Sequence, residues 1–277
     1  MSILSTQQQK QFREEAYCVL CGVIDHESLA WLREDCAYFH GYMDAFMDAQ
    51  KVRTYGLSHR GSRYFISQRY RLSHRLHRFL FGKLMSDVCR ATVGDETYLF
   101  GEQWVLKGAD RGMKFSWHQD AGYVKYRVPG TKVRPYLTCW CALDDVDERN
   151  GTVYVLPHSK AGTRETVFDH VEDAETHDLV GYTGDELGVP IIAPAGSIAL
   201  FSSYNFHRSG GNMTDRMRRV YLAQYTSDRI LRPDGLLFGM AVPFLRAGQV
   251  VYDPDGDTAE RYGPQEAIPG AAKTKPA

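Results

Sequence analysis

The sequence predicts a mainly β protein, a sandwich or barrel of antiparallel strands, with helices at its N-terminal end. From Tyr98 to about Thr226, short apolar runs alternate with turn residues, which is typical of such folds. The first quarter shows helical spacing of apolar side chains instead. With 277 residues and 43% hydrophobic content the chain can bury a full core, so we expect one domain over residues 1–252.

The N-terminal quarter predicts a helix, a strand and a second helix. Ser5 to about Glu15 has helical character, and the run AYCVLCGVI that follows is β-like. Asp25 is a suitable N-cap for the second helix, in which Leu29 and Leu32 share one apolar stripe. We therefore expect helices beside the β-rich part.

Five β-rich runs follow. They are TYLFGEQWVLK, RPYLTCWCALDD, GTVYVLP, VPIIAPAGSIALFSS and RRVYLAQYT. Asn150-Gly151 lies between the second and third runs and favours a tight hairpin. Beyond Asp253 the chain is rich in Pro, Gly and Ala, so we expect residues 253–277 to form a flexible tail.

Charge and composition exclude several classes of protein. The net charge is -1, from 33 Lys+Arg and 34 Asp+Glu, which argues against general nucleic-acid binding. No window approaches the roughly 18 apolar residues of a membrane helix, and the first residues show no secretory pattern. Six dilute cysteines predict reduced thiols. We expect a cytoplasmic protein with no nucleic-acid or membrane partner. The sequence does not indicate which oligomeric state the protein adopts.

The stretch FSWHQDAGY, residues 115–123, carries the first chemical signal. His118 and Asp120 are two residues apart, so on an extended strand both side chains point to one face, about 7 Å apart at the backbone. His207 ends a later apolar run. Two histidines and one carboxylate are the usual ligands of non-haem Fe(II) oxygenases, because they leave adjacent coordination positions open.

Iron sites of this kind need a two-electron donor, commonly 2-oxoglutarate. Its distal carboxylate must be held away from water, and an arginine fork suits that task. Arg218 lies eleven residues after His207. Arg216 shares the strand parity of Arg218, and Arg219 has the opposite parity, so spacing alone leaves open which of them points inward.

These motifs resemble the phytanoyl-CoA dioxygenase family of Fe(II)/2-oxoglutarate oxygenases. The resemblance runs from the N-terminal helix to about Tyr225. It rests on WHQD-GY at 117–123, TCWCALDD at 138–145, NG and VLP within 150–157, and His207 with Ser209, Asn212 and Arg218. At 157–160 the chain has Pro-His-Ser-Lys where the family has Pro-Gly-Ser-His.

The resemblance implies a double-stranded β-helix (jelly-roll, cupin-like) core with flanking N-terminal helices. It implies a hydroxylase of a small-molecule metabolite that uses Fe(II), 2-oxoglutarate and O2 and releases succinate and CO2. The implied metal ligands and catalytic residues are His118, Asp120 and His207. The implied co-substrate residues are Arg218, Ser209, Trp140, Gln103 and Lys107. Because the family's halogenases lack the metal carboxylate, Asp120 disfavours halogenation.

The substrate class is only partly predicted. Residues 51–90 hold ten basic side chains and one acidic side chain, so one option is an anionic substrate bound at the barrel mouth. The other option is a solvated helical face. The candidate substrate-binding residues are Tyr123, Arg60, Arg63, Arg69 and Arg71.

A different class of function is also compatible with the motifs. A cupin-like metal-binding barrel could act as an isomerase or a binding protein without oxygen chemistry. Such a protein would bind no co-substrate and would tolerate loss of Arg218. Within the oxygenase class, desaturation, epoxidation and demethylation would use the same centre, and the sequence does not separate them.

Overall fold

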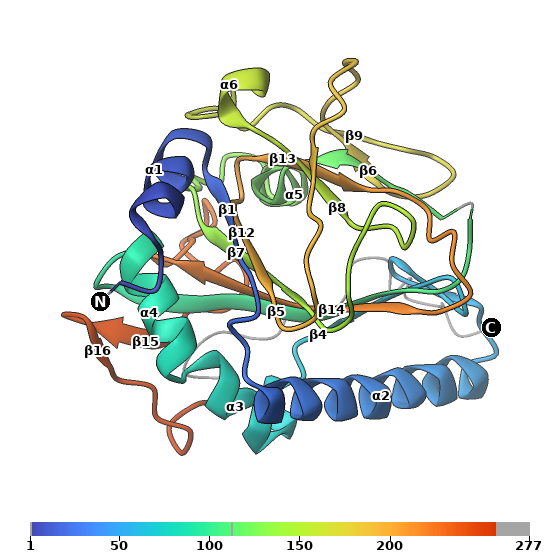
Figure 1. The fold of residues 1–277 in the computed structure, drawn as a ribbon, viewed down its shortest axis with the longest axis horizontal. Coiled ribbons are helices and arrows are strands. Elements are labelled where there is room, and N and C mark those ends of the chain that lie inside the picture. The colour runs from blue at the N-terminus through green and yellow to red at the C-terminus, as the bar shows by residue number, and fades with distance from the viewer. Residues whose placement is uncertain (1, 112, 259–277) are drawn as a thin grey trace.

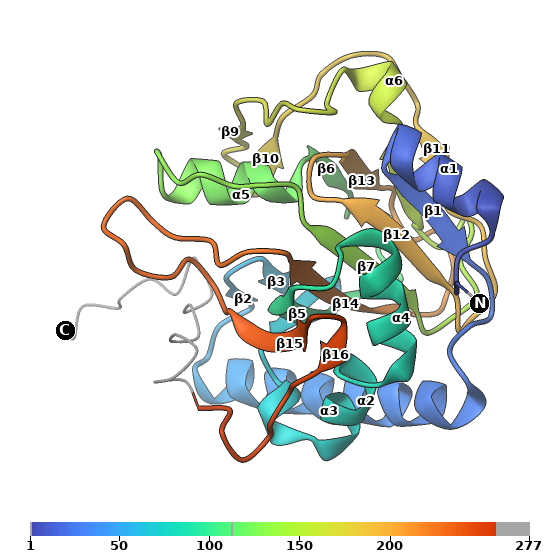
Figure 2. The same ribbon diagram turned by 90° about the vertical axis from the view of Figure 1, so that its left-hand side faces the viewer.

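The computed structural model describes residues 2–111 and 113–258. Two antiparallel sheets face each other, with a layer of helices on the outer side of the larger one (Figures 1 and 2). The helices are α1 (Thr6–Glu15), α2 (His26–Ala49), α3 (His74–Leu80), α4 (Lys83–Thr92), α5 (Asp120–Arg127) and α6 (His158–Ala161), with a 3-10 turn η1 at Tyr70–Leu72. The predicted mainly β class with N-terminal helices is confirmed.

The larger sheet has ten strands among the described residues. Its main path runs β1-β12-β7-β14-β5-β4-β3-β2, with β15 on β5 and β16 on β15. The bounds are β1 (Tyr17–Leu20), β2 (Thr54–Tyr55), β3 (Ser58–His59), β4 (Arg63–Ser67), β5 (Thr97–Lys107), β7 (Leu137–Ala142), β12 (Ile198–Ser202), β14 (Arg218–Thr226), β15 (Val242–Arg246) and β16 (Gln249–Val250).

The smaller sheet has four strands in the order β11-β8-β13-β6, and β9 and β10 form a separate pair. The bounds are β6 (Phe115–His118), β8 (Val153–Leu156), β9 (Val171–Glu172), β10 (Leu179–Val180), β11 (Val189–Pro190) and β13 (Phe206–Ser209). Strands far apart in sequence therefore meet: β13 lies between β8 and β6, and β14 lies between β7 and β5.

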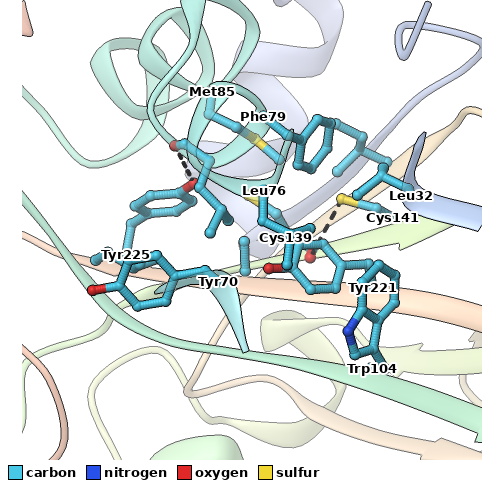
Figure 3. Close-up of a cluster of buried hydrophobic side chains, with 14 of the residues drawn as sticks. Leu32, Tyr70, Leu76, Phe79, Met85, Trp104, Cys139, Cys141, Tyr221 and Tyr225 are labelled. Carbon is cyan, nitrogen blue, oxygen red and sulfur yellow. Dashed lines mark hydrogen bonds between the residues drawn. The ribbon is translucent and has the colours of Figure 1, made fainter. Parts of the chain in front are cut away.

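Two apolar layers hold these parts together. The outer layer lies between the larger sheet and α2, α3 and α4, where Leu32, Leu76 and Phe79 pack toward Trp104 and Tyr221 (Figure 3). The inner layer lies between the sheets; its buried members include Trp140, Ala142, Val153, Val155, Ile191, Phe201 and Val220. Because both faces of β7 are covered, all six of its residues are buried.

The predicted N-terminal elements are confirmed in detail. Ser5 and Gln8 form a reciprocal capping box at α1, with Gln8 N donating to Ser5 Oγ at 3.2 Å. Asp25 caps α2, since its Oδ1 accepts from Ser28 N at 2.8 Å. The β-like run after α1 is β1, which pairs with β12 and so fastens the N-terminus to the larger sheet.

The predicted hairpin at Asn150-Gly151 is wrong. The strands on either side, β7 and β8, belong to different sheets, so this turn carries the chain from one sheet to the other. Gly151 still needs to be glycine: its φ is +75°, and a Cβ there would lie 2.8 Å from the Gly210 carbonyl oxygen. The dipeptide predicts a local turn, but strand pairing depends on distant partners.

The C-terminal segment makes specific contacts before the described residues end. Asp257 pairs with Arg71 at 2.8 Å and accepts a hydrogen bond from the Tyr70 hydroxyl at 2.6 Å, and its side chain is 1% exposed. The rest of the predicted flexible tail, 259–277, lies outside the described residues. In the described part of the chain, no helix is both long and apolar enough to cross a membrane.

Replacing the α2 cap tests how the helical layer is held. Asp25→Ala removes the acceptor for Ser28 N, so we expect unfolding to require about 1 kcal/mol less free energy, measured by urea denaturation. Asp25→Ser retains a capping oxygen and should stay close to wild type. Equal stability of Asp25→Ala and wild type would contradict the assigned cap.

Candidate active site

Three side chains that could hold a metal ion meet between the sheets. His118 on β6 and His207 on β13 are cross-strand partners, with ring centroids 4.1 Å apart. Asp120 is the first residue of α5, and its Oδ1 lies 3.9 Å from Nε2 of His118 and 3.5 Å from Nε2 of His207. One ligand atom from each residue falls within 4.8 Å of the others. The predicted triad therefore converges in space.

Hydrogen bonds orient both imidazoles toward this cluster. Nδ1 of His118 lies 2.8 Å from the Ser116 carbonyl oxygen, and Nδ1 of His207 lies 3.2 Å from that of Asn205. A carbonyl oxygen only accepts, so each Nδ1 carries the proton and each Nε2 presents a lone pair. Burial, and then the neighbouring His207, hold the pKa of His118 well below its usual value. His118 is thus neutral and ready to bind a metal ion.

The Asp120 carboxylate uses its two oxygens differently. Oδ2 accepts hydrogen bonds from the Thr138 hydroxyl at 2.6 Å and from the Gln224 amide at 3.0 Å, while Oδ1 faces the imidazoles. Two imidazoles and one carboxylate oxygen fit Fe(II), which binds mixed nitrogen and oxygen ligands and keeps further positions open.

Two buried cations lie beyond this cluster. Lys107 on β5 and Arg218 on β14 are cross-strand partners, 1% and 2% exposed, and neither has an ion-pair partner among the described residues. The Lys107 ammonium donates to Ser209 Oγ at 2.8 Å and to the Gly210 carbonyl oxygen. Arg218 donates to the Gly151 carbonyl oxygen at 2.9 Å, and its buried Nε has no partner in the part of the chain that the structure describes.

Electrostatics make this pair of cations costly. Burial lowers the pKa of Arg218 to about 10. Burial, and then the charge of Arg218, lower the pKa of Lys107 to about 6. The guanidinium of Arg218 also lies over the Trp140 ring, 5.4 Å from its centroid. Two adjacent basic side chains out of water, with an Arg218 Nε that has no partner among the described residues, form a site for an anion.

A cavity of about 240 Å³ joins the anion site to the three candidate metal ligands, His118, Asp120 and His207. It follows β14 and β5, whose register places Arg218 beside Lys107 at one end and Gln224 beside Gly101 at the other. Beyond the candidate metal ligands the cavity walls are aromatic. The ring centroid of Phe100 lies 4.9 Å from that of Tyr136 and 6.3 Å from that of Phe238. The cavity thus has a basic end, at Lys107 and Arg218, and an aromatic end, at Phe100, Tyr136 and Phe238.

Most of the predicted site residues line this cavity. Those that do are His118, Asp120, His207, Arg218, Ser209, Trp140, Gln103, Lys107, Tyr123 and Arg63. Of the three arginines that spacing left open, only Arg218 lines it; Arg219 instead pairs with Asp144, and Arg216 is exposed.

Of the four candidate arginines in the basic segment 51–90, the structure places one on the cavity wall and three away from it. Arg60, Arg69 and Arg71 do not line the cavity. Arg60 pairs with Asp48 and Arg71 with Asp257. Arg63 does line it, but its charge is paired with buried Asp178 at 2.9 Å.

Several residues of the site were missed by sequence reasoning. Thr138, Gln224, Phe100 and Phe238 all line the cavity. Strand parity could have found Gln224, because it lies six residues after Arg218 on the same strand and so faces the same side. Phe238 lies in a loop after β14, where no periodic pattern applies.

Comparison with known proteins decides the family. The sequence model of the phytanoyl-CoA dioxygenase (PhyH) family matches residues 12–220. The chain belongs to this family. A zebrafish (Danio rerio) phytanoyl-CoA dioxygenase domain-containing protein 1 is 24% identical over 264 residues, covering 80% of this chain and 89% of the relative.

Two further similarities extend the comparison. A probable alpha-ketoglutarate-dependent hypophosphite dioxygenase of Stutzerimonas stutzeri is 30% identical over 149 residues, about half of each protein. The crystal structure of EctD from S. alaskensis with 2-oxoglutarate and 5-hydroxyectoine superimposes with a TM-score of 0.62 at 24% identity, covering 85% of this chain and 81% of that one. The predicted family is confirmed, and the cluster of His118, Asp120 and His207 fits the iron that this family uses with 2-oxoglutarate.

Metal binding can be measured without turnover. We expect the protein to bind one Ni(II) ion, which serves as a redox-stable probe. Loss of a residue that only hydrogen-bonds to a metal ligand lowers metal affinity roughly 10–100-fold, so Asp120→Ala or His207→Ala should lower it by more than that. Isothermal titration calorimetry gives the affinities. Exposed His26, replaced by Ala, serves as the matched control. Unchanged affinity in both cluster variants would contradict the site.

Proposed function

We propose that the protein is an Fe(II)- and 2-oxoglutarate-dependent oxygenase that hydroxylates a C–H bond of a small-molecule metabolite, consuming O2 and releasing succinate and CO2. One observation carries this proposal: a single cavity contains the His118, Asp120 and His207 cluster together with the buried basic side chains of Lys107 and Arg218, which have no ion-pair partner among the described residues. A metal site alone would not require those basic side chains. Bound iron would supply the oxygen chemistry, and the protein would position both substrates.

The proposed architecture follows the sequence expectation. The two facing sheets would form a double-stranded β-helix, with residues 1–252 as a single domain. Their antiparallel pairing and the metal cluster between them support this proposal. A cytoplasmic location stays a prediction.

The co-substrate would lie with its distal carboxylate at Lys107 and Arg218. The Nε of Arg218 is a donor without a partner, and it would bind one carboxylate oxygen. Ser209 accepts from the Lys107 ammonium, so its own hydroxyl hydrogen is available for the second oxygen. Trp140 would support the guanidinium from beneath, and Gln103, which accepts from Ser67 Oγ at 3.2 Å, would form the side wall.

The substrate would occupy the aromatic end of the cavity. Phe100, Tyr136 and Phe238 would contact an apolar body, and Tyr123 would form the wall beside the metal, since its ring meets His118 edge-on at 5.4 Å. An anionic group on the substrate would lie at the rim, where the Arg127 guanidinium lies 5.4 Å from the Tyr123 ring centroid. Arg60, Arg69 and Arg71 would contact only parts of a substrate that extend outside the cavity.

An anaerobic titration tests this function. Fe(II) and 2-oxoglutarate should give the visible charge-transfer band of a chelated keto acid. Arg218→Ala should raise the dissociation constant for 2-oxoglutarate about 10–100-fold, because each charged hydrogen bond contributes about 1.5–3 kcal/mol. Exposed Arg216, replaced by Ala, is the matched control. Bound Fe(II) without a band in wild type would favour the cupin-like alternative instead.

Binding of 2-oxoglutarate should also depend on pH through Lys107. Its pKa of about 6 without the anion means that Lys107 is largely neutral at pH 8. A bound carboxylate favours the charged form and raises this pKa, so binding takes up a proton. The affinity should therefore fall as pH rises above about 6, by up to about tenfold per pH unit.

Calorimetry on Ni(II)-loaded protein at pH 6.5 and 8.5 measures this dependence. Lys107→Met should bind 2-oxoglutarate weakly with little change between the two pH values. Wild-type affinity that is equal at both values would refute the assigned role of Lys107.

A further inference from the structure

The metal-ligating carboxylate of Asp120 is held from the opposite sheet. Asp120 follows β6 of the smaller sheet, whereas its two hydrogen-bond donors, Thr138 on β7 and Gln224 on β14, belong to the larger sheet. These donors are themselves cross-strand partners. The position of the carboxylate therefore depends on how the two sheets face each other, not on α5 alone.

Both donors bind the same oxygen of the carboxylate. The Gln224 amide donates to Asp120 Oδ2 at 3.0 Å and to Thr138 Oγ1 at 3.2 Å. Since the Thr138 oxygen accepts from Gln224, its own hydrogen is directed to Oδ2, which lies 2.6 Å away. Oδ2 is thus occupied by two donors, and Oδ1 alone faces the imidazoles.

The surroundings hold this arrangement in place. Thr138 is 1% exposed, so its hydroxyl is shielded from bulk solvent. Gly101 lies opposite Gln224 on β5, and a Cβ at Gly101 would lie 3.2 Å from the Gln224 side-chain oxygen. Glycine leaves room for the amide to lie against the strand. Thr138, Gln224 and Gly101 thus lie together on the wall of the cavity.

We propose that Thr138 and Gln224 are positioning residues that hold Asp120 as a one-oxygen metal ligand. A carboxylate can bind a metal through one oxygen or both, and an outer partner that fixes its orientation strengthens the site. With Oδ2 occupied, the second oxygen cannot take the coordination position that a keto acid needs. This inference rests on the proposed function, because it assumes a metal ion at the cluster.

Ni(II) affinity and 2-oxoglutarate affinity together test the inference. Thr138→Val and Gln224→Met keep size and remove the donors. Each should weaken Ni(II) binding about tenfold in the absence of 2-oxoglutarate, and each should weaken 2-oxoglutarate binding to the Ni(II)-saturated protein, because the freed Oδ2 competes for its position. Thr138→Ser retains the hydroxyl and should keep both the Ni(II) affinity and the 2-oxoglutarate affinity close to wild type.

Controls separate positioning from general destabilisation. Thr97→Val removes another fully buried hydroxyl, which donates to the Gly94 carbonyl oxygen at 3.2 Å, away from the cavity. It should lower thermal stability without changing Ni(II) affinity. Ni(II) affinity within twofold of wild type in both Thr138→Val and Gln224→Met, or failure of Thr138→Ser to restore it, would overturn the inference. Absence of Ni(II) binding in wild type would instead overturn the proposed function.

Discussion

The burial of positive charge between the two sheets is the constraint on which the site depends. Arg63, Lys107 and Arg218 form one cross-strand row over β4, β5 and β14. Like charges placed opposite one another on a sheet repel, and burial strengthens the repulsion. Asp178 neutralises Arg63 at the end of the row. The other two cations stay uncompensated within the described residues, and the lowered pKa of Lys107 is the physical sign of that cost.

The two sheets divide the work of forming the site. The smaller sheet supplies both imidazoles from β6 and β13, while the larger sheet supplies the cations and the donors that fix Asp120. The turn at Asn150-Gly151 joins the sheets, and its Gly151 carbonyl oxygen accepts from Arg218. The segment that sequence reasoning assigned to a simple hairpin therefore supports the anion site.

Residue pattern could predict those parts of the site that depend on local spacing or strand parity. His118 and Asp120 are two apart and converge as predicted, although Asp120 begins α5 and does not lie on the strand with His118. Caps such as Asp25 act within one helical turn. The choice of Arg218 over Arg219 follows once the inward face of β14 is known. The basic segment could not be interpreted this way, because the acids that pair with Arg63 and Arg71 come from residues 178 and 257.

The same reasoning explains why family membership does not determine the substrate. The family match ends at residue 220, and the candidate metal ligands, Lys107 and Arg218 all lie within it. The wall that would contact the substrate is completed by Phe238, which comes after that limit. The backbone of this loop packs closely against Phe100. Gly239 has a φ of +72°, and a Cβ there would lie 2.7 Å from the Phe100 ring. The shape of the proposed substrate wall thus depends on how a loop outside the match packs against a ring inside it.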